Sequence, residues 1–429
     1  MPGFEAVPII LRGQRECGVT WWSASLRTIL DTKGSEGVRM ELDSGNLDLS
    51  NIPKELSFII SLLNSDGESN RIEWVEDIDW DRFVALARHH RLFPFLYKTL
   101  QPLKDQGIPP IVIDALRKDY QRNTFQMLRL SAEMGYLCEM FEKAGIRTLI
   151  LKGPVLAADL YGDVSQRTSS DLDLMVPLSQ LNEAEKLLES YGYVKDEYIK
   201  TVLNDWKWRH HHYSYYHKQK GLKLEVHWRL SPGPGIEPSF DMLWGRKRIY
   251  EMGGNPIHYL GREDLFYFLI AHGSRHGWSR LRWLKDIDML CKQEVDWTKT
   301  YKLLQRYHSL HIGGQALLLS SKIFGTPISS AMQRIASWKR SEHLAQEAVF
   351  YFENMVNLHS KPLPENVSTY HKGHLFSLMP IQQKLLFVLS FFYPYPEDAE
   401  VLPLPKYLHV LYFPLRPFLW AWRKRRKYA

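Results

Sequence analysis

The periodicity of apolar residues changes twice along this chain, and these two changes restrict its fold more than any other feature. Residues 53–144 carry apolar side chains at helical spacing. Between residues 147 and 230, short apolar runs of strand length alternate with short helical stretches. From residue 262 onward the helical spacing returns. The sequence therefore predicts an α+β protein in which a small mixed sheet is embedded between N-terminal and C-terminal helical units.

The expected elements follow from the same patterns. Strands are expected at 147–151, 172–176, 213–217 and 222–230, with helices at 154–161 and 181–191 between them. Helices are expected before the sheet at 53–63, 80–92 and 111–144, and after it at 263–273, 280–292, 297–308, 313–324, 329–356 and 380–392.

Four segments are predicted along the chain. They are an irregular or disordered arm (1–39), a helical unit (40–145), an α/β core (146–260) and a helical unit with a basic tail (261–429). The arm mixes Gly, Trp, Arg and Cys without a sustained period, which makes Met40 a candidate natural start. An arm that packs irregularly on the body is an equally weighted alternative.

The charge of the chain is concentrated at one end. The net charge is +7, and residues 423–427 (Arg-Lys-Arg-Arg-Lys) supply five of these charges. The remainder is close to neutral, whereas a protein that binds polymeric nucleic acid usually carries a basic stripe. Polymeric nucleic acid is therefore not expected as a partner.

Cysteine usage and hydropathy indicate the compartment. Cys17, Cys138 and Cys291 are far apart in the sequence, so neither a disulfide framework nor a zinc site is expected, and a cytoplasmic location is favoured. No run approaches the roughly 20 apolar residues that span a bilayer. The N-terminus also lacks the pattern of a secretory signal.

Three carboxylates are the candidate catalytic and metal-binding residues. Asp171 and Asp173 alternate along one expected strand, so their side chains share a face. Two ionised carboxylates on one face repel each other unless a cation neutralises them, and Mg²⁺ prefers carboxylate oxygens. Glu225, on a later strand, offers a third carboxylate. A pair of this kind also occurs on solvated strand faces, so its surroundings matter.

Basic and small residues upstream are the candidate phosphate-binding groups. Gly153 lies at a turn from strand to helix, where backbone N–H groups can receive a phosphate, and Lys152 precedes it. Arg167 is expected either to contact a phosphate or to pair with Asp163 or Asp171.

These residues together resemble a known group. The chain is similar to the nucleotidyltransferase fold of the DNA polymerase β superfamily, and in particular to its uncharacterised nucleotidyltransferase family. The resemblance is carried by Lys152-Gly153, Arg167, Ser170-Asp171-Leu172-Asp173 and 225–229 (Glu-Val-His-Trp-Arg). It continues at residues 272–286, extends less distinctly over the helical N-terminal unit with its His89-His90-Arg91 stretch, and covers most of residues 50–420.

The resemblance implies an activity. Two Mg²⁺ ions held by Asp171, Asp173 and Glu225 would serve a nucleoside triphosphate, taken as ATP from its abundance, with Lys152, Gly153, Arg167 and Ser170 at its phosphates. A nucleoside monophosphate would pass to a hydroxyl of a small molecule, sugar or peptide, and pyrophosphate would leave. The turn departs from the superfamily pattern, because Pro154 stands where a serine or glycine is usual.

Two other functional classes stay open. One is a non-catalytic protein of a biosynthetic cluster that binds a nucleotide or a partner. The other is a phosphotransferase that uses the same metal site at the γ-phosphate. The presence of all three carboxylates argues against a site that has lost its activity.

Several histidines and acidic residues have structural interpretations. The run 210–212 is expected to be exposed or at a hairpin edge, since consecutive strand residues alternate faces and cannot easily chelate one ion. His272 and His276 stand i, i+4 without the glutamate of a zinc helix, so capping or core hydrogen bonds are favoured over a place at the acceptor side. Asp286 and Asp288 diverge on a helix, and Asp286 is expected to pair with an arginine such as Arg282.

The C-terminal segment combines aromatic and basic residues. Residues 407–429 place Trp, Tyr and Phe side chains beside the basic run 423–427. This composition suits contact with an anionic membrane surface or an acidic partner. A helix that docks on the core and ends in a frayed basic tail is the somewhat favoured alternative.

Overall fold

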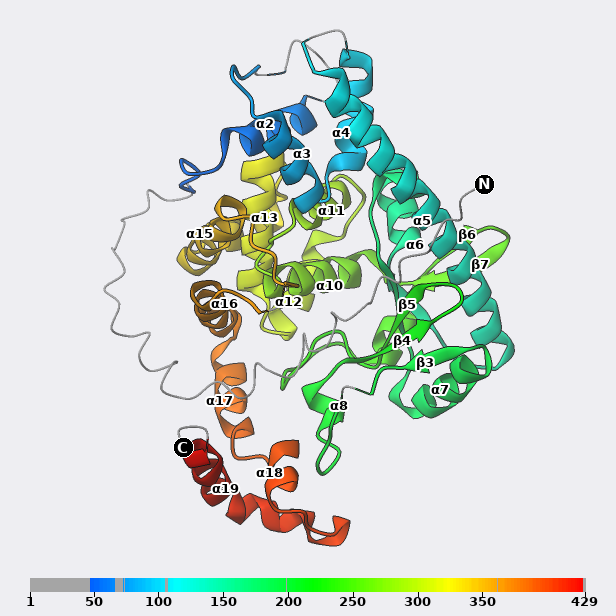
Figure 1. Ribbon diagram of the computed structural model, residues 1–429, viewed down its shortest axis with the longest axis vertical. Coiled ribbons are helices and arrows are strands. Elements are labelled where there is room, and N and C mark those ends of the chain that lie inside the picture. The colour runs from blue at the N-terminus through cyan, green and yellow to red at the C-terminus, as the bar shows by residue number, and fades with distance from the viewer. Residues whose placement is uncertain are drawn as a thin grey trace, which may run out of the picture.

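The computed structural model describes residues 47–65, 72, 74–104, 107–197, 199–360 and 362–426. In it, helices from both ends of the chain surround one flank of a seven-stranded mixed sheet (Figure 1). This confirms the α+β class. The expected arm at 1–39 and the candidate start at Met40 lie outside the described residues.

The described residues of the N-terminal unit form four α-helices. They are α2 (Lys54–Asn64), α3 (Trp80–His89), α4 (Phe93–Leu100) and α5 (Pro110–Lys143). The sequence did not predict α4, because a proline directly after the expected helix 80–92 is typical of a helix end. Pro94 instead lies in the first turn of α4, where its missing N–H costs no helical hydrogen bond.

Seven strands form the sheet in the order β3-β4-β5-β2-β1-β7-β6. The pairs β2–β5 and β1–β7 are parallel, and the other pairs are antiparallel. The strands are β1 (Leu149–Lys152), β2 (Asp171–Met175), β3 (Tyr193–Lys195), β4 (His212–His217), β5 (Leu222–His227), β6 (Arg248–Met252) and β7 (Asn255–Tyr259). Helices α6 (Pro154–Tyr161) and α7 (Leu181–Ser190) connect the first three strands as expected.

The sequence analysis did not predict three of these strands, β3, β6 and β7. β3 has three residues, and the hairpin of β6 and β7 shows half-buried and exposed positions without a run of buried ones. The hairpin turn is formed by Gly253 and Gly254, which both have positive φ angles of 61° and 82°. Adjacent glycines of this kind are typical of two-residue hairpin loops. The turn signal was present, but the flanking strands are too polar to show a period.

The two faces of the sheet pack against different cores. Leu172, Leu174 and Val226 point into a core that also contains the C-terminal half of α5, with Leu130 and Leu137. The opposite face, which carries Asp171 and Asp173, is turned toward the helices of the C-terminal unit. Apolar and acidic residues thus alternate along β2 between a closed core and an open cavity.

The C-terminal unit is helical throughout. One expected helix, 329–356, is divided into α14 (Ser330–Ala336) and α15 (Lys339–Glu353), because Trp338 between them has an extended backbone. Two short helices, α8 (Trp206–Arg209) and α9 (Phe240–Gly245), belong to the preceding α/β core. The first helices of the C-terminal unit are α10 (Arg262–Arg275), α11 (Leu281–Cys291), α12 (Trp297–Arg306) and α13 (Leu310–Phe324). They are followed by α14 (Ser330–Ala336), α15 (Lys339–Glu353), α16 (Glu365–Leu378), α17 (Ile381–Ser390), α18 (Pro396–Val401) and α19 (Tyr412–Arg426).

The N-terminal and C-terminal helices share one hydrophobic core. Leu56 and Phe83 belong to the same buried cluster as Ile270 and Leu317. A hydrogen bond from Asn64 Nδ2 to the carbonyl oxygen of Ile323 (2.8 Å) joins α2 to α13. The two helical units, expected as separate segments, therefore pack as one body beside the sheet. The exact domain boundaries stay a prediction.

The last three helices extend away from this body (Figure 1). Large apolar side chains are exposed along them, including Ile381 (78%), Leu385 (62%) and Phe418 (74%). Tyr412 is fully buried in a small cluster with Val202, so α19 also docks on the molecule. Among the described residues, no helix has both the length and the apolar character needed to cross a membrane.

Glu347 on α15 connects three helices of the C-terminal unit. Its carboxylate lies 3.2 Å from His343 Nε2 and 3.0 Å from His374 Nδ1 of α16. His374 Nε2 in turn lies 3.1 Å from the carbonyl oxygen of Ser274 on α10. Although burial opposes it, hydrogen bonds from the two histidines lower the pKa of Glu347 to about 2. The ionised carboxylate therefore fixes α16 in place.

A depressed carboxyl pKa contributes stability above the ordinary value of 4.5, and this stability is lost as the pH falls toward 2. We expect Glu347→Gln to lose about 3 kcal/mol of the free energy of unfolding at neutral pH and to show a shallower loss between pH 4.5 and 2. Urea unfolding across this pH range measures both. Glu365→Gln, at an exposed position, is the control. A pH profile for Glu347→Gln that parallels the native one would contradict the assignment.

Candidate active site

Neighbouring strands bring the three candidate carboxylates together. β2 and β5 are parallel neighbours, in a register that pairs Asp173 with Glu225 and Asp171 with Lys223. Asp171 and Asp173 point to the same face, as the sequence predicted. Glu225 and His227 share that face from β5. Lys223, two residues before Glu225, joins them and was missed, although the alternation of residues 222–227 places it there.

A bulge brings Lys152 to the same face. Ile150 pairs with Leu174 and Lys152 with Asp173, so β1 contains one extra residue at this point. An extra residue reverses the facing of the side chains that follow it. Lys152 therefore points toward the carboxylates and not into the core beneath the sheet.

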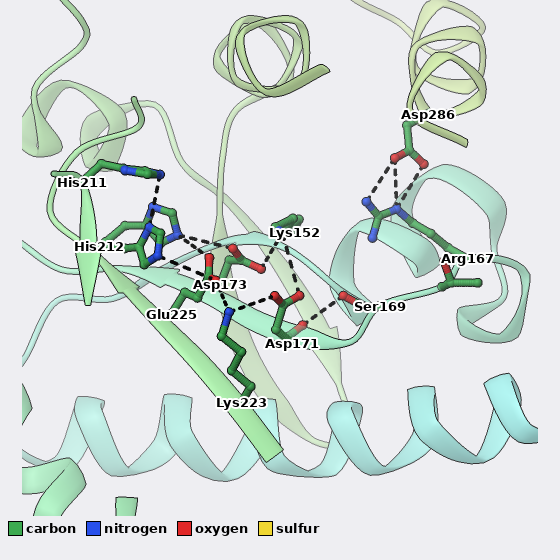
Figure 2. Close-up of polar contacts among 12 residues, drawn as sticks. Lys152, Arg167, Ser169, Asp171, Asp173, His211, His212, Lys223, Glu225 and Asp286 are labelled. Atoms are coloured by element: carbon green, nitrogen blue, oxygen red, sulfur yellow. Dashed lines mark hydrogen bonds and ion pairs between the residues drawn. The ribbon is translucent and has the colours of Figure 1, made fainter. Parts of the chain in front are cut away.

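The carboxylates are closely surrounded by cations (Figure 2). Lys152 Nζ lies 3.0 Å from Asp173 Oδ2 and 3.9 Å from Asp171 Oδ1. Lys223 Nζ lies 2.5 Å from Glu225 Oε1 and 4.0 Å from Asp171 Oδ2. His227 Nε2 lies 3.3 Å from Asp173 Oδ1 and 3.7 Å from Glu225 Oε2. Three negative groups thus share two lysines and one imidazole.

The acid–base properties reflect this crowding. Burial, followed by repulsion from Asp171 and Glu225, raises the pKa of Asp173 despite the nearby lysine. Although burial opposes it, hydrogen bonding to Asp173 and Glu225 raises the pKa of His227. Burial also opposes ionisation of Glu225, but His212, His227 and Lys223, in that order, hold its pKa well below the ordinary value. The site therefore favours added positive charge.

The carboxylate set fits a divalent metal ion. Asp173 Oδ2 is a buried oxygen that receives no well-aligned hydrogen bond, although Lys152 Nζ is close. Asp173, Glu225 and His227 also offer ligand atoms within 4.8 Å of one another. Carboxylate oxygens suit Mg²⁺, whereas the imidazole would also accept a transition metal. The metal assignment of Asp171, Asp173 and Glu225 stays a prediction that this geometry supports.

The histidine run does not have the expected exposure. His210 and His211 are buried and His212 is half-buried, so the expectation of an exposed run is wrong. His211, His212 and His227 offer ligand atoms within 4.8 Å of one another. The run itself does not chelate, but two of its members meet a histidine of β5. Backbone alternation alone could not show this, because the third partner comes from another strand.

The turn after β1 lies outside the wall of the cavity described below, so a phosphate contact at Gly153 stays a prediction. Gly153 has a φ angle of 100°, which requires glycine, but it is buried and does not line the cavity described below. Pro154, the first residue of α6, has no N–H to donate. Ser170, by contrast, is exposed and lines the cavity. Of the predicted phosphate-binding residues, Lys152 and Ser170 are therefore in place.

Arg167 is engaged elsewhere. It forms a buried pair with Asp286 of α11, with Nη2 3.0 Å from Oδ2 and Nε 3.1 Å from both carboxylate oxygens. Tyr161 also donates to Asp286 at 2.8 Å. Neither Asp163 nor Asp171 is its partner, and Arg282 is not the partner of Asp286. Arg167 is 1% exposed and does not line the cavity, so the expected phosphate contact is replaced by a structural one.

A cavity of about 1900 Å³ extends from the carboxylates into the C-terminal unit. Its walls include Lys152 and Glu225 at one end and Tyr370 and Phe387 at the other. His272 and His276 are half-buried in its wall, with ring centroids 4.6 Å apart, which supports the acceptor-side place over core hydrogen bonding. Asp288 faces away, toward Lys285 and Lys292. A cavity of this size exceeds the usual range of roughly 300–1,000 Å³ for one small ligand.

A cavity that carries a cluster of three carboxylates and two lysines in its wall, here Asp171, Asp173, Glu225, Lys152 and Lys223, is the arrangement that enzymes of phosphoryl and nucleotidyl transfer use. The sequence matches the model of a family described as uncharacterised nucleotidyltransferase over residues 76–325, more than half of the chain. The protein belongs to this nucleotidyltransferase family, as the sequence motifs predicted.

Other comparisons are more distant. A solved structure titled as an antigenic nucleotidyltransferase-like protein from Paracoccidioides brasiliensis is similar over 48% of this chain and 97% of its own. The two share 16% sequence identity, with a TM-score of 0.29. No curated protein matches the sequence.

The Arg167–Asp286 pair generates a prediction about stability. Asp286→Asn leaves a buried guanidinium without a counter-ion, which costs about 3–5 kcal/mol of the free energy of unfolding. Chemical denaturation measures this loss. Asp241→Asn removes an exposed ion pair with Arg147 and is expected to leave the stability nearly unchanged. Equal effects of the two substitutions would refute a special role for the buried pair.

Proposed function

We propose that the protein is a metal-dependent nucleotidyltransferase that moves a nucleoside monophosphate from a nucleoside triphosphate to an acceptor hydroxyl and releases pyrophosphate. The observation that carries this proposal is the meeting of Asp171, Asp173 and Glu225 on one face of two adjacent strands. Family membership supports nucleotidyl transfer in general. The donor is taken as ATP from its abundance.

Each residue of the site has a defined task in this proposal. Asp171, Asp173 and Glu225 would hold two Mg²⁺ ions, which when bound neutralise the triphosphate and polarise its α-phosphorus. Lys152 and Lys223, released from the carboxylates by that added charge, offset negative charge on the phosphates. The low pKa of Glu225 keeps it ionised, which suits a metal ligand better than a strong base.

The cavity supports a second substrate beside the nucleotide. Its volume of about 1900 Å³ leaves room for an acceptor. Hydrogen-bonding side chains such as His272, His276 and Ser274 line the wall between α10 and the carboxylates. We propose an acceptor that presents a hydroxyl, in a small molecule, a sugar or a peptide.

Asp173→Asn provides the direct test. Loss of one carboxylate charge is expected to reduce nucleotidyl transfer by about a thousandfold, equivalent to roughly 4 kcal/mol of transition-state stabilisation. Transfer is measured with ATP labelled at the α-phosphate, and a parallel reaction carries the label at the γ-phosphate. Circular dichroism and thermal melting check that the variant folds. Asp196→Asn, at an exposed position, is the matched control.

The two labels separate the proposal from its alternatives. Label that moves from the α-position supports nucleotidyl transfer. Label that moves from the γ-position indicates a phosphotransferase, and binding without movement of either label indicates a non-catalytic protein. Full activity of Asp173→Asn would sink the site assignment.

We further propose a cytoplasmic location and peripheral contact with an anionic membrane surface. The described thiols of Cys138 and Cys291 are free, as in a reducing compartment. Helices α17 and α19 expose apolar side chains, and the basic run 423–427 follows these side chains of α19 in the sequence. Apolar and basic groups together attract a segment to an anionic surface.

Liposome co-sedimentation tests the membrane contact. The full chain is expected to sediment with vesicles that contain phosphatidylserine, and a chain that ends at Pro417 is expected to stay largely in the supernatant. Vesicles of phosphatidylcholine alone are the control for charge. Equal sedimentation of the two chains would contradict a role of the C-terminal residues in membrane contact. Binding to an acidic protein without binding to vesicles would show that these residues contact a protein partner.

A further inference from the structure

Three arginines, one half-buried and two buried, gather beside the carboxylates without forming an ion pair within the described residues. Arg91, Arg280 and Arg282 line the cavity near Asp171. Among the described residues, none of the three forms an ion pair within 4 Å, whereas their neighbour Arg167 is neutralised by Asp286. This part of the cavity wall therefore carries excess positive charge next to the carboxylates.

Burial makes this surplus costly. Arg280 is 9% exposed and Arg282 8%, and Arg282 Nε is buried with no hydrogen-bond partner among the described residues. Burial, together with repulsion from Arg91, lowers the pKa of Arg280 to about 10. Burial and repulsion from Arg167 lower the pKa of Arg282 to about 9. Buried cations of this kind are stable in proteins when an anion pairs with them.

The His89-His90-Arg91 stretch holds this group in place. Arg280 Nη1 lies 3.1 Å from His89 Nδ1, and the backbone N–H of Leu281 donates to His90 Nδ1 at 3.4 Å. The backbone N–H of Arg282 donates to the carbonyl oxygen of His90 at 3.3 Å. The end of α3 is thereby fastened to the start of α11. A guanidinium group fixed in this way loses little entropy when it binds a ligand.

Arg91 occupies a position that favours glycine. Its φ angle is 56°, directly after the C-cap of α3, where a left-handed residue commonly ends a helix. A non-glycine residue there costs conformational energy, and strain of this kind collects at functional sites. An arginine at a strained position that points into a cavity indicates that its side chain is needed there.

A side cavity of about 400 Å³ adjoins this group. It shares Arg91, Ser169 and Arg280 with the main cavity. Its single lining carboxylate, Asp119, is already paired with Arg88 at 2.6 Å and with Arg122 at 3.4 Å. The side cavity is thus open, adjacent to Asp171 and positively charged.

We propose that Arg91, Arg280 and Arg282 form a binding site for an oligophosphate, in place of the turn at Gly153-Pro154, which does not line the cavity. This inference rests on the proposed function, because that function supplies the substrates that carry the phosphates. They belong either to the nucleotide donor or to a phosphorylated acceptor. Guanidinium groups recognise either through the same paired hydrogen bonds.

Inorganic tripolyphosphate is the probe for this site. Its binding is measured by calorimetry with the full chain in EDTA, so that neither metal ions nor transfer activity contribute. Arg91→Gly and Arg280→Gln are each expected to weaken binding at least tenfold. Arg91→Gly also relieves the backbone strain at φ 56°, so it is expected to fold at least as stably as the native chain. Arg117→Gln, which removes an exposed arginine of α5, is the control.

The outcomes separate this inference from the proposed function, because the probe carries no nucleoside to transfer. Lack of binding by the native chain, or native-like binding by both variants, overturns the arginine site whatever the transfer assay shows. Competition by ATP assigns the site to the donor. Competition by O-phosphoserine, but not by ATP, assigns it to the acceptor.

Discussion

Mutual repulsion among Asp171, Asp173 and Glu225 is the physical constraint around which this site is organised. The parallel pairing of β2 and β5 places Asp173 directly beside Glu225, so their charges cannot separate. Lys152 reaches them through a bulge, Lys223 by strand alternation and His227 by its place at the end of β5. Each of these groups reduces the repulsion among the carboxylates by lying close to at least one of them. Three carboxylates that already require positive neighbours also favour the binding of metal ions. The lysines beside them can then bind the phosphates of a ligand.

Residues from distant parts of the chain complete the site. Arg91 comes from the end of α3, the carboxylates from the sheet, and Arg280 from the start of α11. The buried pair of Arg167 and Asp286 joins the segment before β2 to α11, so the position of the carboxylate strand is tied to the C-terminal unit. The cavity lies where these parts meet. A change in helix packing can therefore move the carboxylates of β2 through buried charged contacts such as the Arg167–Asp286 pair.

Local periodicity predicted much of this structure, and contacts between distant segments account for most of what it missed. The alternation of Asp171, Leu172 and Asp173 was sufficient to place both carboxylates on one face. The bulge that redirects Lys152 depends on pairing with β2, which the sequence of β1 alone does not reveal. The partner of Arg167 was expected to be a phosphate, Asp163 or Asp171, because Asp286 lies 119 residues away in the sequence. His211 was expected to be exposed because the strand and helices that cover it come from elsewhere in the chain.

The core shared by the two ends of the chain has a consequence for synthesis on the ribosome. The hydrogen bond between Asn64 and Ile323 spans 259 residues. At the usual rate of about 5–20 residues per second, α2 leaves the ribosome roughly 13–50 s before its partner α13 is made. During that interval the apolar faces of α2 and α3 have no permanent cover. The sheet can pack on α5 before synthesis is complete, whereas α2 and α3 complete their packing only after α13 is made. We therefore expect the nascent chain to bind chaperones through its exposed apolar surface.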